Sequence, residues 1–155
     1  MSAQRIDRFT EHAFLAWLAM AAVLIGTFGV RYLRGTLGDP DITSLTEAMM
    51  IPLISMTVPV GAVAFGVFWP SIRAINAATR GRLGTLGLAA AGAALSLPAV
   101  LAFAVGGYLL WPSSESFVDQ FARNVRHPSF GYLFAAFVVG GMTVGAGVRK
   151  RIPAR

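Results

Sequence analysis

Few side chains of this sequence are able to do chemistry, and they stand in its polar segments. The only histidines, His12 and His127, are separated by several long apolar runs. Five carboxylates fall in two polar segments. Asp39, Asp41 and Glu47 lie within residues 31–47, and Glu115 and Asp119 lie with His127 within residues 112–130. Carboxylates and histidine bind divalent metals, but these residues lack the spacing of a metal-binding motif. We expect no metal site, and two histidines on opposite sides of a membrane cannot bind one haem.

Other cofactors and reactions lack the residues that they need. The sequence contains no cysteine, which excludes disulfides, thiolate catalysis, iron–sulfur ligation and cysteine zinc sites. Intramembrane catalysis and proton-coupled transport generally use an ionisable residue within the bundle, and the apolar runs hold none. We therefore expect no cofactor, and the function is more consistent with a non-enzyme.

The elements that must position these residues are apolar helices. The chain is 55% hydrophobic and 13% charged, with a mean hydropathy of +0.65, which is typical of a membrane protein. Four runs without Asp, Glu, Lys, Arg or His are long enough to cross a bilayer: 13–30, 48–69, 83–111 and 131–148. No small-x-small cleavage site follows the first run, so we expect it to be retained. The sequence predicts an all-α polytopic protein, an antiparallel bundle of four transmembrane helices in one domain.

Basic residues predict the orientation. Nine of the 13 Lys and Arg residues lie in the N-terminal segment, the loop after the second run and the tail. The other two loops hold Arg31, Arg34, Arg123 and Arg126 together with five of the seven acidic residues. The positive-inside rule then places both termini in the cytoplasm. The excess of Arg over Lys suggests a GC-rich bacterial genome, so we expect a bacterial inner membrane. Topology explains the net charge of +6 without nucleic acid.

Small residues at intervals of four predict how the helices pack. The fourth run carries Gly141 and Gly145, and the third carries Gly87 with Ala91 and Gly92 with Ser96. Such pairs let two backbones approach closely in lipid, where no hydrophobic drive brings helices together. We expect these residues to pack the protein's own bundle; the alternative is that at least one of the pairs faces a neighbouring subunit.

Three prolines lie inside predicted helices. Ser44 and Glu47 fit a capping box, so the second helix should begin near Leu45 and contain Pro52 and Pro59. Seven residues are nearly two turns, so the two bends should add. Pro98 should loosen the Ala94 carbonyl near Ser96. We expect kinks that fit neighbouring helices together, although a binding site at these kinks remains open.

The loop between the third and fourth runs predicts a short amphipathic helix at about 114–126. Phe117 and Phe121 fall on one face, whereas Asp119 and Arg123 form an i, i+4 pair on the other. This helix should lie on the outer membrane surface.

Three hypotheses for function follow. The leading one is a non-catalytic membrane subunit that packs with itself, as a homo-oligomer, or with other membrane protein subunits. The second is a homo-oligomeric channel or facilitator for a small neutral or anionic solute, lined by Ser55, Thr57, Ser96 and freed carbonyls. The third is a membrane enzyme with an outer-surface site built from Glu115, Asp119, Arg123 or His127.

Overall fold

The computed structural model describes residues 3–37, 41–110 and 114–149, and all regular secondary structure in this part of the chain is helical. The helices in chain order are α1 (Ala3–Leu33), α2 (Leu45–Val63), the π-helical segment η1 (Ala64–Phe68), α3 (Trp69–Ala78), α4 (Thr85–Ala94), α5 (Ser96–Leu110), α6 (Phe117–Arg126) and α7 (Pro128–Arg149). Four stretches are long and apolar enough to cross a membrane: Glu11–Leu33, Val58–Ala78, Thr85–Leu110 and Ser129–Gly147. The prediction of an all-α protein with four such helices is confirmed.

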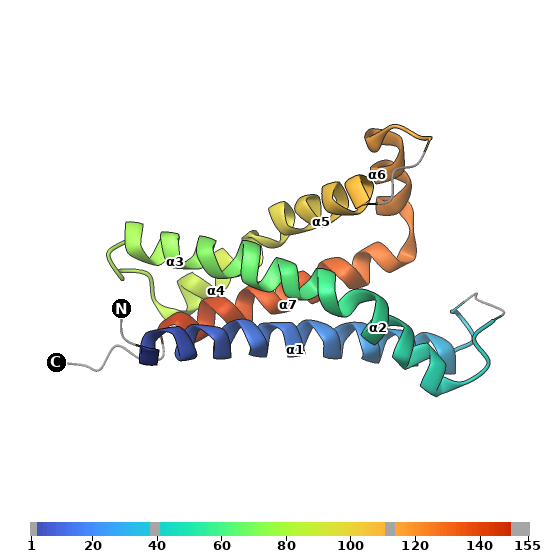
Figure 1. The fold of residues 1–155 in the computed structure, drawn as a ribbon, viewed down its shortest axis with the longest axis horizontal. Coiled ribbons are helices and arrows are strands. Elements are labelled where there is room, and N and C mark those ends of the chain that lie inside the picture. Colours follow the sequence, from blue (N-terminus) through green and yellow to red (C-terminus); the bar gives the residue numbers. More distant parts are fainter. Residues whose placement is uncertain (1–2, 38–40, 111–113, 150–155) are drawn as a thin grey trace.

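The ends of these helices meet in two groups. The start of α1, the connection from α3 to α4 and the end of α7 lie at one end of the molecule (Figure 1). The connection from α1 to α2 and helix α6 lie at the other end. Asp39 and the basic tail at residues 150–155 fall outside the described part of the chain.

Helix α2 begins as the sequence predicts. Ser44 is its N-cap: the Ser44 hydroxyl accepts a hydrogen bond from the Glu47 amide (3.1 Å), and the Glu47 carboxylate accepts one from the Ser44 amide (3.1 Å). This capping box confirms the prediction. Pro52 and Pro59 both lie inside α2, and the helix changes direction along its length in Figure 1.

The predicted end of the second run at residue 69 is wrong. Helix continues through η1 and α3 to Ala78, so the following loop is shorter and Arg73 lies in a helix. Pro70 follows the π-helical turn, in which the Trp69 amide donates to the Ala64 carbonyl five residues earlier. Such local π adjustments let a membrane helix tolerate a proline, because they give the displaced backbone groups new partners. The Arg73 guanidinium lies over the Trp69 ring, 5.4 Å from its centroid.

The third run is not one continuous helix. Helix α4 ends at Ala94, and α5 starts at Ser96. Pro98 has no amide hydrogen to donate to the Ala94 carbonyl, and the helix breaks at this point. The buried Ser96 hydroxyl donates to the Ala93 carbonyl (2.6 Å), one residue before the carbonyl that the sequence indicated. In Figure 1, α4 follows α7, whereas α5 diverges from it.

Helices α4 and α7 pack at backbone distance. A Cβ built on Gly92 would collide with the Gly141 carbonyl group, and one built on Gly145 would collide with the Leu88 carbonyl group. Gly87 does not take part in this backbone contact. A Cβ built on it would meet only the side chain of Leu83, four residues earlier in the chain (3.2 Å). Ala91 is partly buried and packs against the core.

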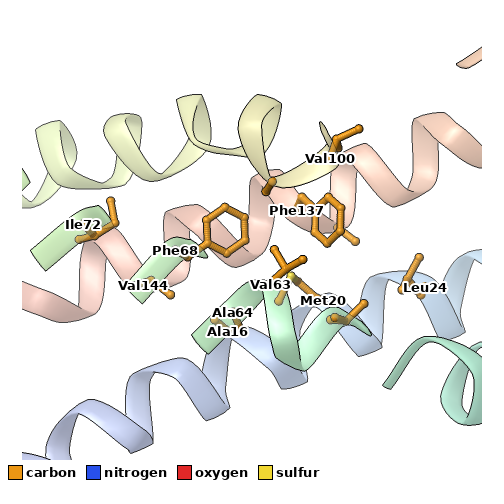
Figure 2. Packing of buried hydrophobic residues seen from close by; sticks show 13 residues of the cluster. Ala16, Met20, Leu24, Val63, Ala64, Phe68, Ile72, Val100, Phe137 and Val144 are labelled. Carbon is orange, nitrogen blue, oxygen red and sulfur yellow. The ribbon is translucent and has the colours of Figure 1, made fainter. Parts of the chain in front are cut away.

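The core lies where α1, α2, η1, α3, α5 and α7 meet (Figure 2). Its largest fully buried side chains include Phe68 of η1, Phe137 of α7 and Met20 of α1. The Phe137 ring packs edge-on against Phe68 (centroids 6.3 Å apart) and against Phe103 of α5 (5.7 Å). Phe103 therefore helps to tie α5 to the core, together with the buried Ala99 and Val100.

Candidate functional site: the cleft between α2 and α5

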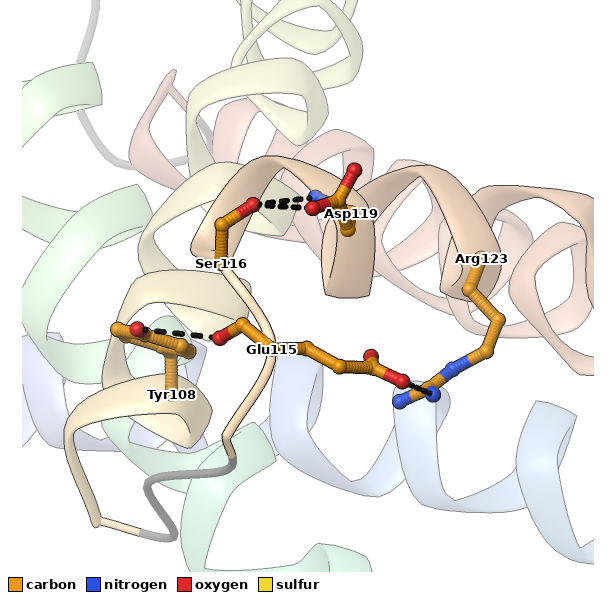
Figure 3. A network of polar contacts seen from close by, with 5 residues as sticks. All are labelled: Tyr108, Glu115, Ser116, Asp119 and Arg123. Carbon is orange, nitrogen blue, oxygen red and sulfur yellow. Dashed lines mark hydrogen bonds and ion pairs between the residues drawn. The ribbon is translucent and has the colours of Figure 1, made fainter.

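Helix α6 is fixed by polar contacts at its N-terminus (Figure 3). The Ser116 hydroxyl accepts a hydrogen bond from the Asp119 amide (3.2 Å) and lies 2.6 Å from the Asp119 carboxylate. Arg123 forms its ion pair with Glu115 (2.5 Å), not with Asp119, so the predicted Asp119–Arg123 pair is wrong. Asp119 instead serves the N-cap, where a carboxylate also favours the helix dipole.

A series of aromatic rings fastens α6 to its neighbours. Tyr108 of α5 packs edge-on against Phe117, and Phe117 stacks on Phe121. Phe121 then meets Phe130 of α7, with centroids 6.4 Å apart. The Tyr108 hydroxyl also donates to the Glu115 carbonyl (3.4 Å). Phe117 and Phe121 thus face the helices, while Asp119 and Arg123 face outward and are exposed.

Between α2 and α5 lies an apolar cleft of about 450 Å³, here named the α2–α5 cleft. Its α2 wall includes Ser55, Val58, Pro59 and Ala62, and its α5 wall includes Ala102, Phe103, Gly106 and Gly107. The cleft exists because α5 diverges after the break at Leu95 and touches α2 only sparsely. Small side chains on both walls leave the space unfilled.

A second cavity of about 300 Å³ lies beneath α6. Phe103 and Gly107 line both this cavity and the α2–α5 cleft, so the Phe103 side chain stands at the boundary of the two. The deeper walls are apolar, with Leu24, Met56 and Val100 among them, whereas Gln120, Asn124, His127 and Ser129 line the end near α6. The cavity therefore changes from apolar to polar toward α6.

Ser55 and Ser96, two of the residues predicted to line a solute path, do not both line the α2–α5 cleft. Ser55 lines the α2–α5 cleft, but its hydroxyl donates to the Ile51 carbonyl of its own helix (2.7 Å). Ser96 is buried and is not among the residues that line the cleft. The Thr57 side chain lies outside the described part of the structure. Of the three prolines, Pro59 lines the cleft, Pro52 is buried in α2, and Pro98 is exposed at the break that opens it.

The polar residues at the end of the molecule that holds α6 and the α1–α2 connection have separate local partners. His127 accepts a hydrogen bond from the Ser129 amide through Nδ1 (3.3 Å). Glu47 accepts from the Thr43 amide (2.8 Å) and hydroxyl (3.0 Å), and these bonds hold the pKa of its carboxyl below the usual value, the Thr43 amide contributing most. Among the described residues, no group of three or more His, Asp or Glu side chains is placed to hold a metal ion.

The sequence predicted kinks at the prolines next to the α2–α5 cleft, but it did not predict the cleft itself. One available signal was the spacing of Ala102 and Gly106, four residues apart on a single face of α5, which repeats the pattern of small residues used elsewhere for packing. The chain matches no protein-family model, and neither the curated proteins nor the solved structures contain a significant match to it.

Proposed function

We propose that this protein is a non-catalytic integral subunit of a membrane assembly, in which the α2–α5 cleft receives helix α5 of a second copy. The cleft carries this proposal, because it is an apolar space between two helices of the kind that cross membranes. In lipid, helices associate through close packing of small residues, and both walls of the cleft present such residues.

The proposal includes an antiparallel four-helix bundle in a bacterial inner membrane, with both termini in the cytoplasm. Supporting this orientation, the start of α1, the α3–α4 connection and the end of α7 share one end of the molecule (Figure 1). Those are the segments with the most Lys and Arg residues in the sequence, as the positive-inside rule requires for the cytoplasmic side. Helix α6 then lies across the outer end, with its charged face toward water.

The small residues of this chain fall into two sets. Gly92, Gly141 and Gly145 form contacts within the subunit, where they let α4 pack against α7. By contrast, a Cβ built on Gly106 or Gly107 would meet nothing within 4 Å. The second set is therefore free to receive side chains from another helix.

A second copy offers the matching shape. Leu97, Leu101, Val105 and Leu109 recur every fourth residue on α5 and are 67%, 49%, 38% and 72% exposed. This ridge lies on the face next to the one that lines the cleft, and i±4 ridges fit into the grooves of a partner helix. Around a two-fold axis along the membrane normal, each subunit would place its ridge in the cleft of the other.

Cysteine crosslinking in native membranes tests the proposal, because the chain has no cysteine of its own. Ala102→Cys puts a thiol in the α2–α5 cleft, and Ala135→Cys puts one at an exposed position of α7 as a matched control. Treatment with a short bismaleimide should give a covalent dimer from the Ala102 variant and none above background from the Ala135 variant.

Equal dimer yields from both variants would contradict the proposed interface. If the Ala102 variant instead reacts with a different membrane protein and gives no dimer, the occupant is a heterologous subunit and the second copy is wrong. A purified monomer with transport or turnover of its own would overturn the proposal as a whole.

A further inference from the structure

A separate groove of about 720 Å³ lies between α1 and α7, beside the α1–α2 connection. Its floor is apolar and includes Ala22, Gly26 and Val30 of α1. Its rim is cationic and polar, with Arg31, Arg34 and Tyr132. An apolar track that ends at two arginines matches the division of a phospholipid into acyl chain and headgroup.

Arg31 is held in place by three contacts. Its guanidinium donates to the Ser129 hydroxyl (3.2 Å) and to the Thr36 carbonyl (2.9 Å), and it lies over the Tyr132 ring, 5.8 Å from the centroid. A guanidinium has five N–H donors, so these two hydrogen bonds leave further donors for a ligand. The bonds also fix the direction in which the charge points.

Arg34 is exposed, and its side chain makes no hydrogen bond or ion pair with another residue in the described part of the structure. Ser129 in the first turn of α7 contacts Arg31, so the positive end of that helix dipole lies near the same rim and adds to the two arginine charges. A phosphate oxygen is the partner that guanidinium groups bind with the best geometry.

The track on α1 has the length of one lipid leaflet. Ala22, Gly26, Val30 and Arg34 follow one another at intervals of four, so they form a single line along the helix. Twelve residues rise about 18 Å, compared with about 15 Å for half of the hydrocarbon layer. A Cβ built on Gly26 would meet nothing within 4 Å, so the middle of the track is open.

We infer that this groove binds one anionic phospholipid, its phosphate on Arg31 and Arg34 and one acyl chain along Ala22, Gly26 and Val30. The site needs the chain to lie in a membrane but does not need the α2–α5 cleft to have an occupant. Two cationic groups with no carboxylate among the residues that line the groove favour a headgroup with net negative charge.

Native mass spectrometry of the purified protein tests this site. Phosphatidylglycerol should be retained in preference to phosphatidylcholine with the same acyl chains. Arg34→Gln should weaken phosphatidylglycerol binding about fivefold, the effect of one basic residue near an anionic lipid surface. Gly26→Leu, which places a side chain in open space on the track, should reduce retention of both lipids. Arg126→Gln, in the exposed last turn of α6, is the control and should bind as the wild type.

Competition with inorganic phosphate separates a lipid site from a free-anion site. Millimolar phosphate should not displace the lipid, because it has no acyl chain to occupy the track. Displacement of the lipid by phosphate, equal retention of the two lipids, or wild-type binding by Arg34→Gln would each overturn the inference. Wild-type retention by Gly26→Leu would refute the placement of the acyl chain.

Discussion

Adding one methyl group at Gly92 should separate α4 from α7. A Cβ at this position would lie 2.5 Å from the Gly141 carbonyl carbon and 3.2 Å from the Met142 nitrogen, in addition to its collision with the Gly141 oxygen. Ordinary contact begins near 3.4 Å, so the carbonyl carbon alone requires a separation of about 0.9 Å and the closer oxygen requires more; the helices must move apart by more than about 1 Å. The colliding atoms belong to the backbone and cannot rotate away as a side chain would.

The cost follows from this displacement. Overpacking costs about 1–3 kcal/mol, and a rigid backbone obstacle places Gly92→Ala at the upper end of that range. Replacing Gly by Ala inside a helix returns about 1 kcal/mol through helix propensity. The expected net loss is about 2 kcal/mol, which lowers the ratio of folded to unfolded protein by roughly 30-fold.

Reversible unfolding in mixed micelles of sodium dodecyl sulfate and a mild detergent, followed by circular dichroism, measures this loss. Gly26→Ala is the matched control, since its methyl group enters open space; its stability should be unchanged or higher by up to about 1 kcal/mol. If Gly92→Ala and Gly26→Ala unfold at the same detergent ratio, the close approach of α4 and α7 is refuted.

Three further changes test local features. Ser44→Ala removes the N-cap of α2 and should cost about 1 kcal/mol, seen as faster amide exchange in the first turn of the helix. The Glu47 carboxyl has a folded pKa below its ordinary 4.5, so its contribution is present above pH 4.5 and is lost as pH falls through the lower folded value. Amide exchange at the start of α2 should therefore accelerate in acid, and Glu47→Gln should remove this pH dependence. Pro98→Ala restores a donor for the Ala94 carbonyl and should slow amide exchange across residues 94–98. It should also change the distance between spin labels placed at Val58 and Ala102, on the two walls of the cleft. An unchanged distance would show that the proline does not determine the width of the cleft.

Some features followed from the sequence because their causes are local. Four uncharged apolar runs predict helices, since backbone groups in hydrocarbon have no water to bond and must satisfy one another. The capping box at Ser44 and Glu47 was equally predictable, because all of its hydrogen bonds join residues three apart. The helical face that carries Phe117 and Phe121 follows from the period of 3.6 residues.

Other features depend on contacts between distant segments, and the sequence did not determine them. Arg123 had acidic neighbours at both Asp119 and Glu115; the cap at Ser116 engages Asp119, and Arg123 pairs with Glu115. Glycine spacing marked several surfaces for close packing, but only the position of α7 selected Gly92 for backbone contact and left Gly106 open. The helix continues from η1 into α3, beyond residue 69, because a π-helical turn accommodates Pro70. No local sequence pattern predicted this turn.

The α2–α5 cleft shows most clearly how local sequence and tertiary packing each contribute to the structure. Pro98 marks where the hydrogen-bond ladder weakens, but a missing donor does not determine the direction in which the next helix departs. That direction is set by α4 packing against α7 on one side of the break, and by Phe103 and the rings of Tyr108 and Phe117 on the other. The sequence alone determined where the chain is helical and where it is weak, while tertiary packing decided which surfaces closed and which remained open.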